Sequence, residues 1–546
     1  MKRPLLLLLP LLGWLGLYLA TLTDVHTYDA LSYILDVDRK PWPELFHPHH
    51  LAYGPLGWLI RRVAGLFGHS TSAEVLLQAT NAVAGAFGTA LFGWIVGRAT
   101  GADRWGCLAA LLLGSSYAYW YYAVEVEVYT IAALFLIAAL GLMLALLQQP
   151  SLLIAGGLGV AHGLATLFHQ TNVLLAIPVL VVVIAAGTGS GAVGRRLKLF
   201  LAYAVPAAIL IGSAYLWVGL GVSGFRNWEQ LFAWAAGYTI TGWWGGPIDG
   251  NTWAELGKGL SETLAQPGGL FAWIGLLVVL SISWRGLRDI APPIALLAAT
   301  WLLAYGLFFA WWEPDNIEFW IASLPPLYLW LILIASRSKV PWVGPLLAVV
   351  GAGMLAGNGI SIAQRGDPAR DLQRQIAAAL IERSNPGDLI VVPDGLLELY
   401  LPFYGGREQV AALTWAMLPG DGWPAACDRL QSRIEVALAS GFAVLIATDA
   451  IRPTAAPPGQ PPTMMERFGL TPDQIATCYA PYLPAATAMH LKADLPNYAR
   501  IASAQELASG PGWNFIRSTW GWRAERVAFV THDTQGWSLR PERDPA

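Results

Sequence analysis

Long apolar runs with few charges dominate the first two thirds of the chain. The first run, "PLLLLLPLLGWLGLYLATL", follows Lys2 and Arg3 and contains about 18 apolar residues, which is enough for one membrane crossing. Because the run is long and no small-residue cleavage site follows it, we interpret it as a retained helix rather than a signal peptide. Lys2 and Arg3 then predict a cytoplasmic N-terminus.

Windows of about 20 apolar residues predict further membrane helices along the chain. They lie near residues 73–98, 105–122, 126–148, 151–168, 171–187, 198–220, 268–284, 291–311, 318–335 and 341–358. With the first run, this makes about eleven crossings. The stretch 151–187 would be roughly 55 Å long as one helix, too long for a core of about 30 Å, so we expect a hairpin there.

The charges between these runs divide into two sets. Alternation from a cytoplasmic N-terminus places the basic residues on one side, as the positive-inside rule requires: Arg98, Arg104, Arg195, Arg196, Lys198, Arg285, Arg288, Arg337 and Lys339. The other side receives the carboxylate-rich stretches 23–72, 125–127, 221–266 and 311–320. Within the first of these, "LAYGPLGWLIRRVAGLFG" is too short and charged to span, and we expect an amphipathic helix in the outer interface.

After about residue 360 the pattern changes. "RDLQRQIAAALIERSNPGDLIVVPDGLLELYLPFYGG" predicts helix, Gly-bounded strand and helix, and "GFAVLIATDA" predicts another buried strand. We therefore expect an all-α polytopic membrane domain over residues 1–360 and an α/β domain over 361–546. An odd number of crossings places this second domain outside the cytoplasm.

Composition supports a membrane class and excludes others. The chain is 55% hydrophobic and 13% charged, whereas soluble domains average roughly a quarter charged. A net charge of −3 offers no basic surface for nucleic acid, and three cysteines cannot form a disulfide scaffold. Cys427 and Cys478 could pair if their domain lies outside the cytosol, but spacing alone leaves this open.

Candidate chemistry begins directly after the first helix, in "TDVHTYDALSYILDVD". If 29–38 is helical, Asp29, Tyr33 and Asp36 fall at i, i+4 and i+7 on one face, with His26 on the same side. The alternative is a solvated polar loop with ordinary acidic residues.

Four outer-face stretches carry a family resemblance: "TYDALSY", "FHPHHLAYGPLG", "AVEVEVYTIAAL" and "LATLFHQTNVLLAIP". With the topology, they resemble the GT-C superfamily of polytopic membrane glycosyltransferases, and within it the bacterial relatives of transmembrane protein O-mannosyltransferases. In those proteins an essential Asp precedes a Tyr in the first outer loop, and His-Pro-Pro-Gly, Glu-Val-Tyr and His-His-Thr elements follow. The corresponding positions here are Asp29 and Tyr33, His47-Pro48, Glu127-Val128-Tyr129 and His169-Gln170-Thr171.

The match is incomplete. His49 and His50 stand where Pro and Gly are expected, and Gln170 replaces a His. The resemblance covers roughly residues 1–335 through short motifs and says nothing of the C-terminal domain. It implies transfer of a sugar from a polyprenyl-phosphate donor to a protein, lipid or glycan acceptor at the outer face of a bacterial plasma membrane.

An inverting transfer needs a carboxylate to take the acceptor hydroxyl proton. Asp29 is our candidate base, and Asp24, nearer the membrane boundary, is the second candidate. Glu125 and Glu127 lie about 200° apart around a helix, so only one can share a cleft with Asp29. The resemblance selects Glu127, to orient the acceptor or hold a divalent cation; the alternative is a carboxylate at a helix start.

The histidines and the Trp-rich segment supply candidate substrate contacts. His47 and His50 could bind a phosphate. The alternative is that His47, His49 and His50 bind zinc, although no cysteine completes a site. The run His169 to Asn172 is costly between two apolar helices unless it lines a cavity, and a hydrogen-bonded turn is the alternative. In "WWEPDNIEFW", an aromatic belt explains the tryptophans, whereas the polar side chains suit sugar hydroxyls. Our candidates there are Trp312, Glu313, Asn316 and Glu318.

Two other classes stay open. A transporter or flippase of a lipid-linked sugar would also have many helices, but it should show midpoint charges or two related halves, and no repeat stands out. A membrane scaffold presenting the C-terminal domain would tolerate loss of Asp29. The expected partners are the donor, its acceptor and membrane lipid, without nucleic acid.

Overall fold

The computed structural model describes residues 5–68, 72–188, 191–237, 245, 248–393, 396–417, 420–456, 463–491 and 497–502. They fall in two compact units, one within Met1–Asp367 and the other within Pro368–Thr534. The first unit is helical, and the second contains a sheet.

Each of the predicted membrane segments is helical in the first unit. The corresponding elements are α1 (Leu5–Leu19), α4 (Ala73–Thr100), α5 (Asp103–Ser115) with α6 (Tyr117–Val124), α7 (Tyr129–Gln148), α8 (Leu152–Phe168), η3 (Gln170–Leu175) with α9 (Ala176–Ala186), α10 (Ala192–Leu216), α13 (Gly269–Ser283), α14 (Pro292–Trp312), α16 (Leu324–Ser336) and α17 (Val343–Arg365). Among the described residues, 7 helices are long and apolar enough to cross a membrane. The chain is a multi-pass integral membrane protein.

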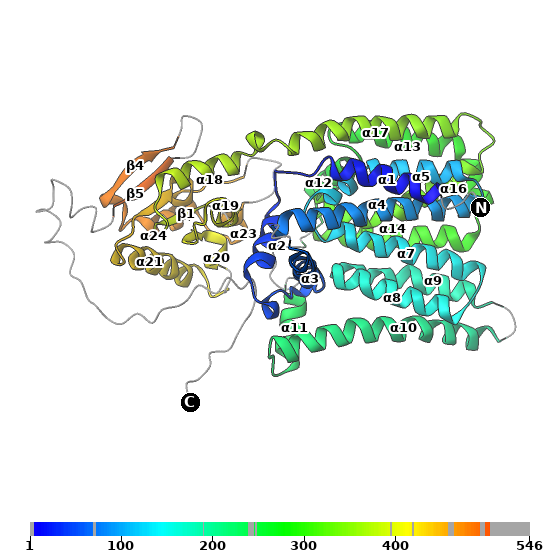
Figure 1. Ribbon diagram of the computed structural model, residues 1–546, viewed down its shortest axis with the longest axis horizontal. Coiled ribbons are helices and arrows are strands. Elements are labelled where there is room, and N and C mark those ends of the chain that lie inside the picture. Colours follow the sequence, from blue (N-terminus) through cyan, green and yellow to red (C-terminus); the bar gives the residue numbers. More distant parts are fainter. Residues whose placement is uncertain are drawn as a thin grey trace, which may run out of the picture. The chain divides into compact units, whose positions relative to one another are not determined.

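The long helices lie side by side and roughly parallel (Figure 1). Those that expose the most side-chain surface are α10, α13, α14 and α17, whereas α4, α7 and α16 are mostly covered by neighbours. Shorter helices gather at one end of the bundle: α2 (Tyr28–Arg39), α3 (Tyr53–Leu66) and α11 (Trp228–Ala236). The remaining short helices of this unit are α12 (Gly250–Leu264) and α15 (Ile317–Trp320). The amphipathic helix expected after residue 50 is therefore present as α3.

One predicted helix is broken. The apolar run 105–122 suggested a single segment, but α5 ends at Ser115 and α6 starts at Tyr117, with Ser116 in an extended conformation. The Ser115 hydroxyl donates to the Leu111 carbonyl at 2.6 Å, and the Ser116 hydroxyl contacts Tyr328 Oη at 2.6 Å. Serine side chains compete with the helix for backbone groups, so hydropathy alone missed this break.

A buried amide joins three parts of this unit. Asn358 of α17 is 0% exposed; its Nδ2 donates to the carbonyls of Ser115 at 2.7 Å and Leu264 at 2.8 Å, and its Oδ1 accepts from Gln266 N at 3.0 Å.

We expect Asn358→Leu to destabilise the protein by about 1–3 kcal/mol or more, because it leaves buried carbonyls without a donor. The melting temperature of the purified protein in detergent would measure this loss. Thr300→Val is the control, because the Thr300 hydroxyl bonds only within its own helix, to Leu296 O at 2.8 Å and Leu297 O. Equal melting temperatures for the two variants would contradict the prediction.

The second unit is built around a 5-stranded sheet of order β2-β1-β3-β5-β4. Its strands are β1 (Leu389–Val392), β2 (Val410–Ala412), β3 (Val444–Ala447), β4 (Ala486–His490) and β5 (Asn497–Ile501). Helices α18 (Leu372–Arg383), α19 (Leu396–Gly405), α20 (Leu413–Met417), α21 (Trp423–Ala439), α22 (Thr448–Ile451), α23 (Met464–Arg467) and α24 (Pro472–Tyr479) surround it. The first three strands are parallel and fully buried, as expected for strands covered on both faces. The predicted α/β character of this region is confirmed.

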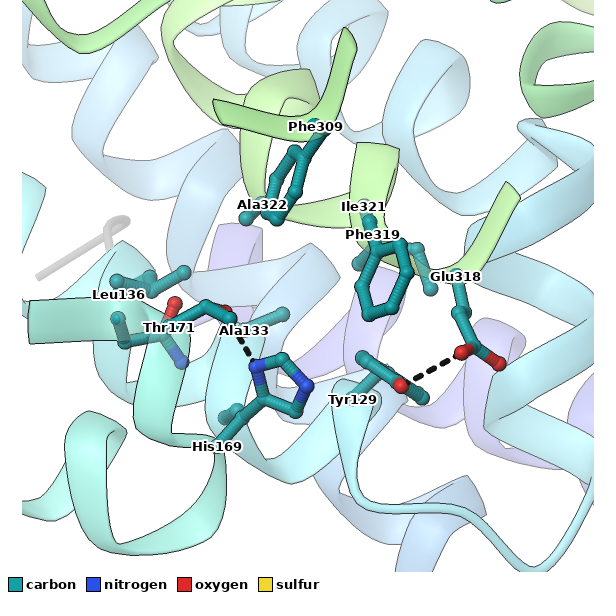
Figure 2. A pocket seen from close by; sticks show the side chains of 12 residues that line it. Tyr129, Ala133, Leu136, His169, Thr171, Phe309, Glu318, Phe319, Ile321 and Ala322 are labelled. Carbon is teal, nitrogen blue, oxygen red and sulfur yellow. Dashed lines mark hydrogen bonds between the residues drawn. The ribbon is translucent and has the colours of Figure 1, made fainter. Parts of the chain in front are cut away.

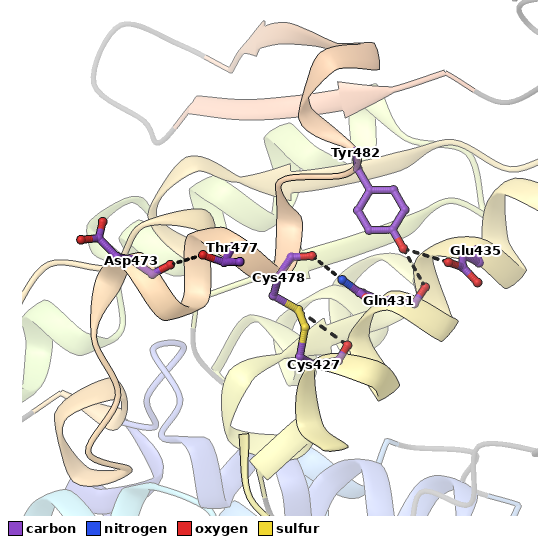
Figure 3. The surroundings of a disulfide bond; sticks show 7 residues. All are labelled: Cys427, Gln431, Glu435, Asp473, Thr477, Cys478 and Tyr482. Atoms are coloured by element: carbon purple, nitrogen blue, oxygen red, sulfur yellow. Dashed lines mark hydrogen bonds between the residues drawn. A yellow bond between two sulfur atoms is a disulfide. The ribbon is translucent and has the colours of Figure 1, made fainter. Parts of the chain in front are cut away.

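Cys427 of α21 and Cys478 of α24 form a disulfide, which settles the pairing that spacing left open (Figure 3). Gln431 Nε2 donates to the Cys478 carbonyl at 2.8 Å beside it, and Tyr482 Oη donates to Glu435 Oε1 at 3.2 Å. The bond and these contacts tie α24 to α21.

Candidate active site

The first candidate carboxylate lies at the start of α2. Thr27 caps this helix, accepting from Ala30 N at 3.0 Å, and places Asp29 in its first turn. Asp29 is partly accessible yet densely surrounded, and burial followed by the charge of Glu313 raises its pKa to about 6. Asp24, the second candidate base, is exposed, and its backbone N–H donates to Arg365 O. A raised pKa suits a general base, so Asp29 has the more suitable surroundings.

The two glutamates lie in the turn between α6 and α7, not within a helix as their predicted separation of about 200° assumed, and they have different partners. Glu125 Oε1 accepts from His26 Nδ1 at 2.9 Å and from Val126 N at 2.7 Å. Glu127 Oε1 instead accepts from the Thr27 hydroxyl at 2.9 Å, and its Oε2 has no hydrogen-bond partner among the described residues. Burial raises the pKa of Glu127, which precedes α7, and the charge of Asp29 raises it further.

A third carboxylate comes from the Trp-rich segment. Glu318 at α15 accepts hydrogen bonds from Tyr122 at 3.1 Å, Tyr129 at 2.7 Å and Asn316 at 2.8 Å. Asn316 also donates to Glu313 Oε2 at 3.2 Å. The contacts with Tyr122 of α6 and Tyr129 of α7 bring Glu318 to the two helices that flank the turn carrying Glu127. Trp312 stacks on Phe308, with ring centroids 5.6 Å apart.

Histidines from two segments form a stack beside these carboxylates. His50, in η2 (Pro48–His50), stacks on His47 at 5.3 Å and on His169 at 5.1 Å between ring centroids. Burial lowers the pKa of His47 to about 3 and that of His49 to about 4, so both rings are neutral near pH 7. Tyr33 packs edge-on against His50 at 6.0 Å. No group of three His, Cys, Asp or Glu side chains within the described ranges is arranged to hold a metal ion.

His169 faces a small cavity of about 10 Å³, room for about one water molecule (Figure 2). Tyr129, Thr171 and Glu318 give it polar edges, and Phe309 and Phe319 are among its apolar lining. The Thr171 hydroxyl contacts His169 Nδ1, and the ring centroids of His169 and Tyr129 lie 4.7 Å apart.

Asn172 also lines this cavity, but its side chain holds the turn together. Its Nδ2 donates to Ala165 O at 3.0 Å, and its Oδ1 accepts from Tyr305 Oη at 3.2 Å. In the polar run after α8, His169 therefore lines a cavity, whereas the Asn172 side chain forms a hydrogen-bonded turn. The two alternatives considered for this run thus apply to different residues.

Three further polar side chains lie near the site; the sequence placed His26 beside Asp29 without giving it a role, and Lys40 and Arg365 are not among the sequence-based candidates. Lys40 Nζ pairs with Asp36 Oδ1 at 2.8 Å, and its charge is one of the minor influences that lower the pKa of His47. His26 bridges Glu125 and, at 3.3 Å, Glu74. Arg365 donates to the hydroxyls of Tyr117 and Tyr121, both at 3.0 Å. The i, i+4 spacing of Asp36 and Lys40 is the sequence signal for their ion pair. The partners of His26 and Arg365 are distant in sequence, so no local pattern indicates them.

Solved structures provide the informative comparison with known proteins. No protein-family model matches the chain, and no curated protein matches it. The structure of ArnT from Cupriavidus metallidurans bound to undecaprenyl phosphate matches with a TM-score of 0.58 and 15% identity, covering 90% of this chain and 97% of ArnT. The apo structure of the same protein matches with a TM-score of 0.58 and 15% identity, covering 92% and 98%. The chain thus has the ArnT-like GT-C fold, which confirms the predicted fold class. The narrower resemblance to relatives of O-mannosyltransferases stays a prediction.

Proposed function

We propose that the chain is an integral membrane glycosyltransferase that moves a sugar from a polyprenyl-phosphate donor to an acceptor hydroxyl. The observation that supports this most is the proximity of three carboxylates, Asp29, Glu127 and Glu318. They come from segments far apart in the sequence of an ArnT-like fold and lie close enough to interact electrostatically. ArnT itself was solved with undecaprenyl phosphate, a lipid of the class we assign to the donor.

In the proposed step Asp29 takes the acceptor proton. The acceptor oxygen forms a bond to the anomeric carbon while the bond from that carbon to the phosphate oxygen breaks, so polyprenyl phosphate leaves and the configuration inverts. Carboxylates around the sugar ring stabilise the positive charge that develops there. Glu127, with its free Oε2, orients the acceptor, and Glu318 and Asn316 bind sugar hydroxyls.

The leaving phosphate needs donors or a cation. We assign this role to His47, His50 and His169, which are stacked together, and to Lys40, whose charge acts on His47. A neutral imidazole donates one hydrogen bond and an ammonium group adds charge. A divalent cation at Glu127 would take most of its ligands from phosphate and water, because the described residues contain no set of three protein ligands.

The active site faces the outside of the cell in this proposal. The basic residues predicted to be cytoplasmic include Arg337, which donates to Asp289 O at 2.8 Å, so the loops before α14 and after α16 meet at one membrane face. A disulfide in the second unit suits an oxidising compartment. We therefore place the N-terminus in the cytoplasm and the second unit outside it.

Transfer from a panel of radiolabelled polyprenyl-phosphate sugars, followed by mass analysis of the labelled product, tests this function. Membranes with the wild-type chain should label an acceptor that membranes without it do not. If no donor is used, binding and transbilayer transport of a polyprenyl-phosphate sugar are measured with the purified protein. A missing acceptor predicts binding without transport, a transporter predicts both, and a scaffold predicts neither.

We expect turnover to fall by about tenfold per pH unit below roughly pH 6, because only the ionised Asp29 carboxylate can accept a proton. The pKa of Asp29 is raised to about 6 by burial and then by Glu313, so removing the second cause should lower this pKa. In Glu313→Gln the acidic limb of the kcat profile should therefore move to lower pH. An unchanged limb would contradict the assignment of that limb to Asp29.

A further inference from the structure

The outer end of α4 carries three polar side chains on one face. Glu74, Gln78 and Asn81 are spaced at i, i+4 and i+7 within a membrane helix that is mostly apolar. Gln78 is 3% exposed and Asn81 is 0% exposed. Buried amides at such positions are costly unless they are hydrogen-bonded, so their partners are informative.

Two members of this face hold the first outer loop. Gln78 Nε2 donates to the Thr23 carbonyl at 2.7 Å, and Glu74 Oε1 lies 3.3 Å from His26 Nε2. The held residues lead directly into Thr27 and Asp29 at the start of α2. The position of Asp29 therefore depends on α4.

The third member holds the turn that carries Glu127. Asn81 Nδ2 donates to two carbonyls, that of Glu125 at 2.7 Å and that of Glu127 at 2.6 Å. The close approach requires Gly85 one turn further on, where a Cβ would lie 2.7 Å from Ala123 Cβ. One amide thus sets the backbone of the turn.

Two side-chain contacts connect the held segments to each other. His26 Nδ1 meets Glu125 Oε1 at 2.9 Å, and the Thr27 hydroxyl donates to Glu127 Oε1 at 2.9 Å. Burial lowers the pKa of His26, but Glu125 and then Glu74 outweigh it and raise the pKa to about 10, so the His26 ring is protonated near pH 7.

We propose that this face of α4 positions the two candidate catalytic carboxylates, Asp29 and Glu127, relative to each other, with Gln78 and Asn81 as positioning residues. The inference rests on the proposed function, and it assigns no substrate contact to either amide. Displacement of a reacting group by about 1 Å can cost roughly a hundredfold in rate. Loss of either amide should therefore lower kcat more than donor affinity.

The test compares Asn81→Leu and Gln78→Met with wild type and with Thr80→Val, whose hydroxyl bonds within its own helix to Leu76 O at 2.7 Å. We expect Asn81→Leu to lower kcat by about 10- to 100-fold while the dissociation constant of the donor changes less than about twofold. In a Glu127→Gln background the same change should lower kcat by less than about threefold, because contacts that act through one another are not additive.

The outcomes separate the inference from the proposed function. A wild-type chain that transfers no sugar and binds no donor overturns both. With an active wild type, an unchanged kcat in a folded Asn81→Leu overturns the inference alone, as does an equal loss with and without the Glu127 carboxylate. If Asn81→Leu fails to fold, Gln78→Met decides. A fall in its kcat that exceeds the change in donor affinity supports the inference, and an unchanged kcat overturns it. Failure of both to fold would make this face a folding element and overturn its positioning role.

Discussion

Asp29→Asn should reduce sugar transfer by roughly 10²- to 10⁴-fold, the range expected for loss of a general base. Asparagine has nearly the same shape but cannot accept the acceptor proton, so binding of the polyprenyl-phosphate donor should stay near the wild-type value. The substitution also removes a carboxylate whose pKa is raised by burial and by Glu313, so the melting temperature should not fall. Initial transfer rates and donor binding measured on the same purified preparations would establish both points.

Two variants of nearby carboxylates control this experiment. Asp38→Asn changes an acid of the same helix whose Oδ1 lies 3.2 Å from Arg61 Nε, away from the proposed chemistry, and should leave transfer within about threefold of wild type. Asp24→Asn tests the other candidate base, which is exposed. Full activity in Asp29→Asn together with a large loss in Asp24→Asn would reverse the assignment.

Replacing both Cys427 and Cys478 by serine should destabilise the second unit by about 2–4 kcal/mol. The bond closes a loop with a sequence separation of 51 and joins α21 to α24, so its loss frees the unfolded chain more than the folded one. At fixed protease concentration, cleavage within the second unit should accelerate by about 30- to 1000-fold, because cleavage follows the population of the opened state.

Cys107→Ser is the matched control for this prediction. Cys107 is a free, exposed cysteine of α5, so its replacement should leave the cleavage rate of the second unit unchanged. Treatment of the wild-type protein with a reductant should reproduce the double replacement. Equal cleavage of the oxidised and reduced protein would show that the disulfide does not stabilise this unit.

Hydropathy predicted the membrane helices well because a lipid environment demands long apolar segments with internally bonded backbones. The same argument could not locate the break at Ser116, whose hydroxyl contacts Tyr328, 212 residues away in sequence. In the second unit, the strand at Leu389–Val392 was readable from its short apolar run, whereas the strand order was not.

The candidate site was partly readable as well. Asp29 and Glu127 could be singled out by their position after apolar runs and by the motifs around them. Gln78 and Asn81 do not stand out in the sequence, because in a window of 20 residues two amides hardly alter mean hydropathy. Their helical spacing was a usable signal, but it does not reveal that their partners are Thr23 and the Glu125–Glu127 turn.

The membrane class, the approximate helix limits and the α/β character of the C-terminal region can be predicted from the sequence, since they follow from local composition and period. The expected rotation of about 200° between Glu125 and Glu127 assumed a helix, whereas both residues lie in the turn between α6 and α7. Only the tertiary structure decided which histidines stack, that Glu318 meets Tyr122 and Tyr129, and that α4 holds both carboxylate-bearing segments. Such contacts join residues far apart along the chain, and their energies depend on distance and burial that no local pattern contains.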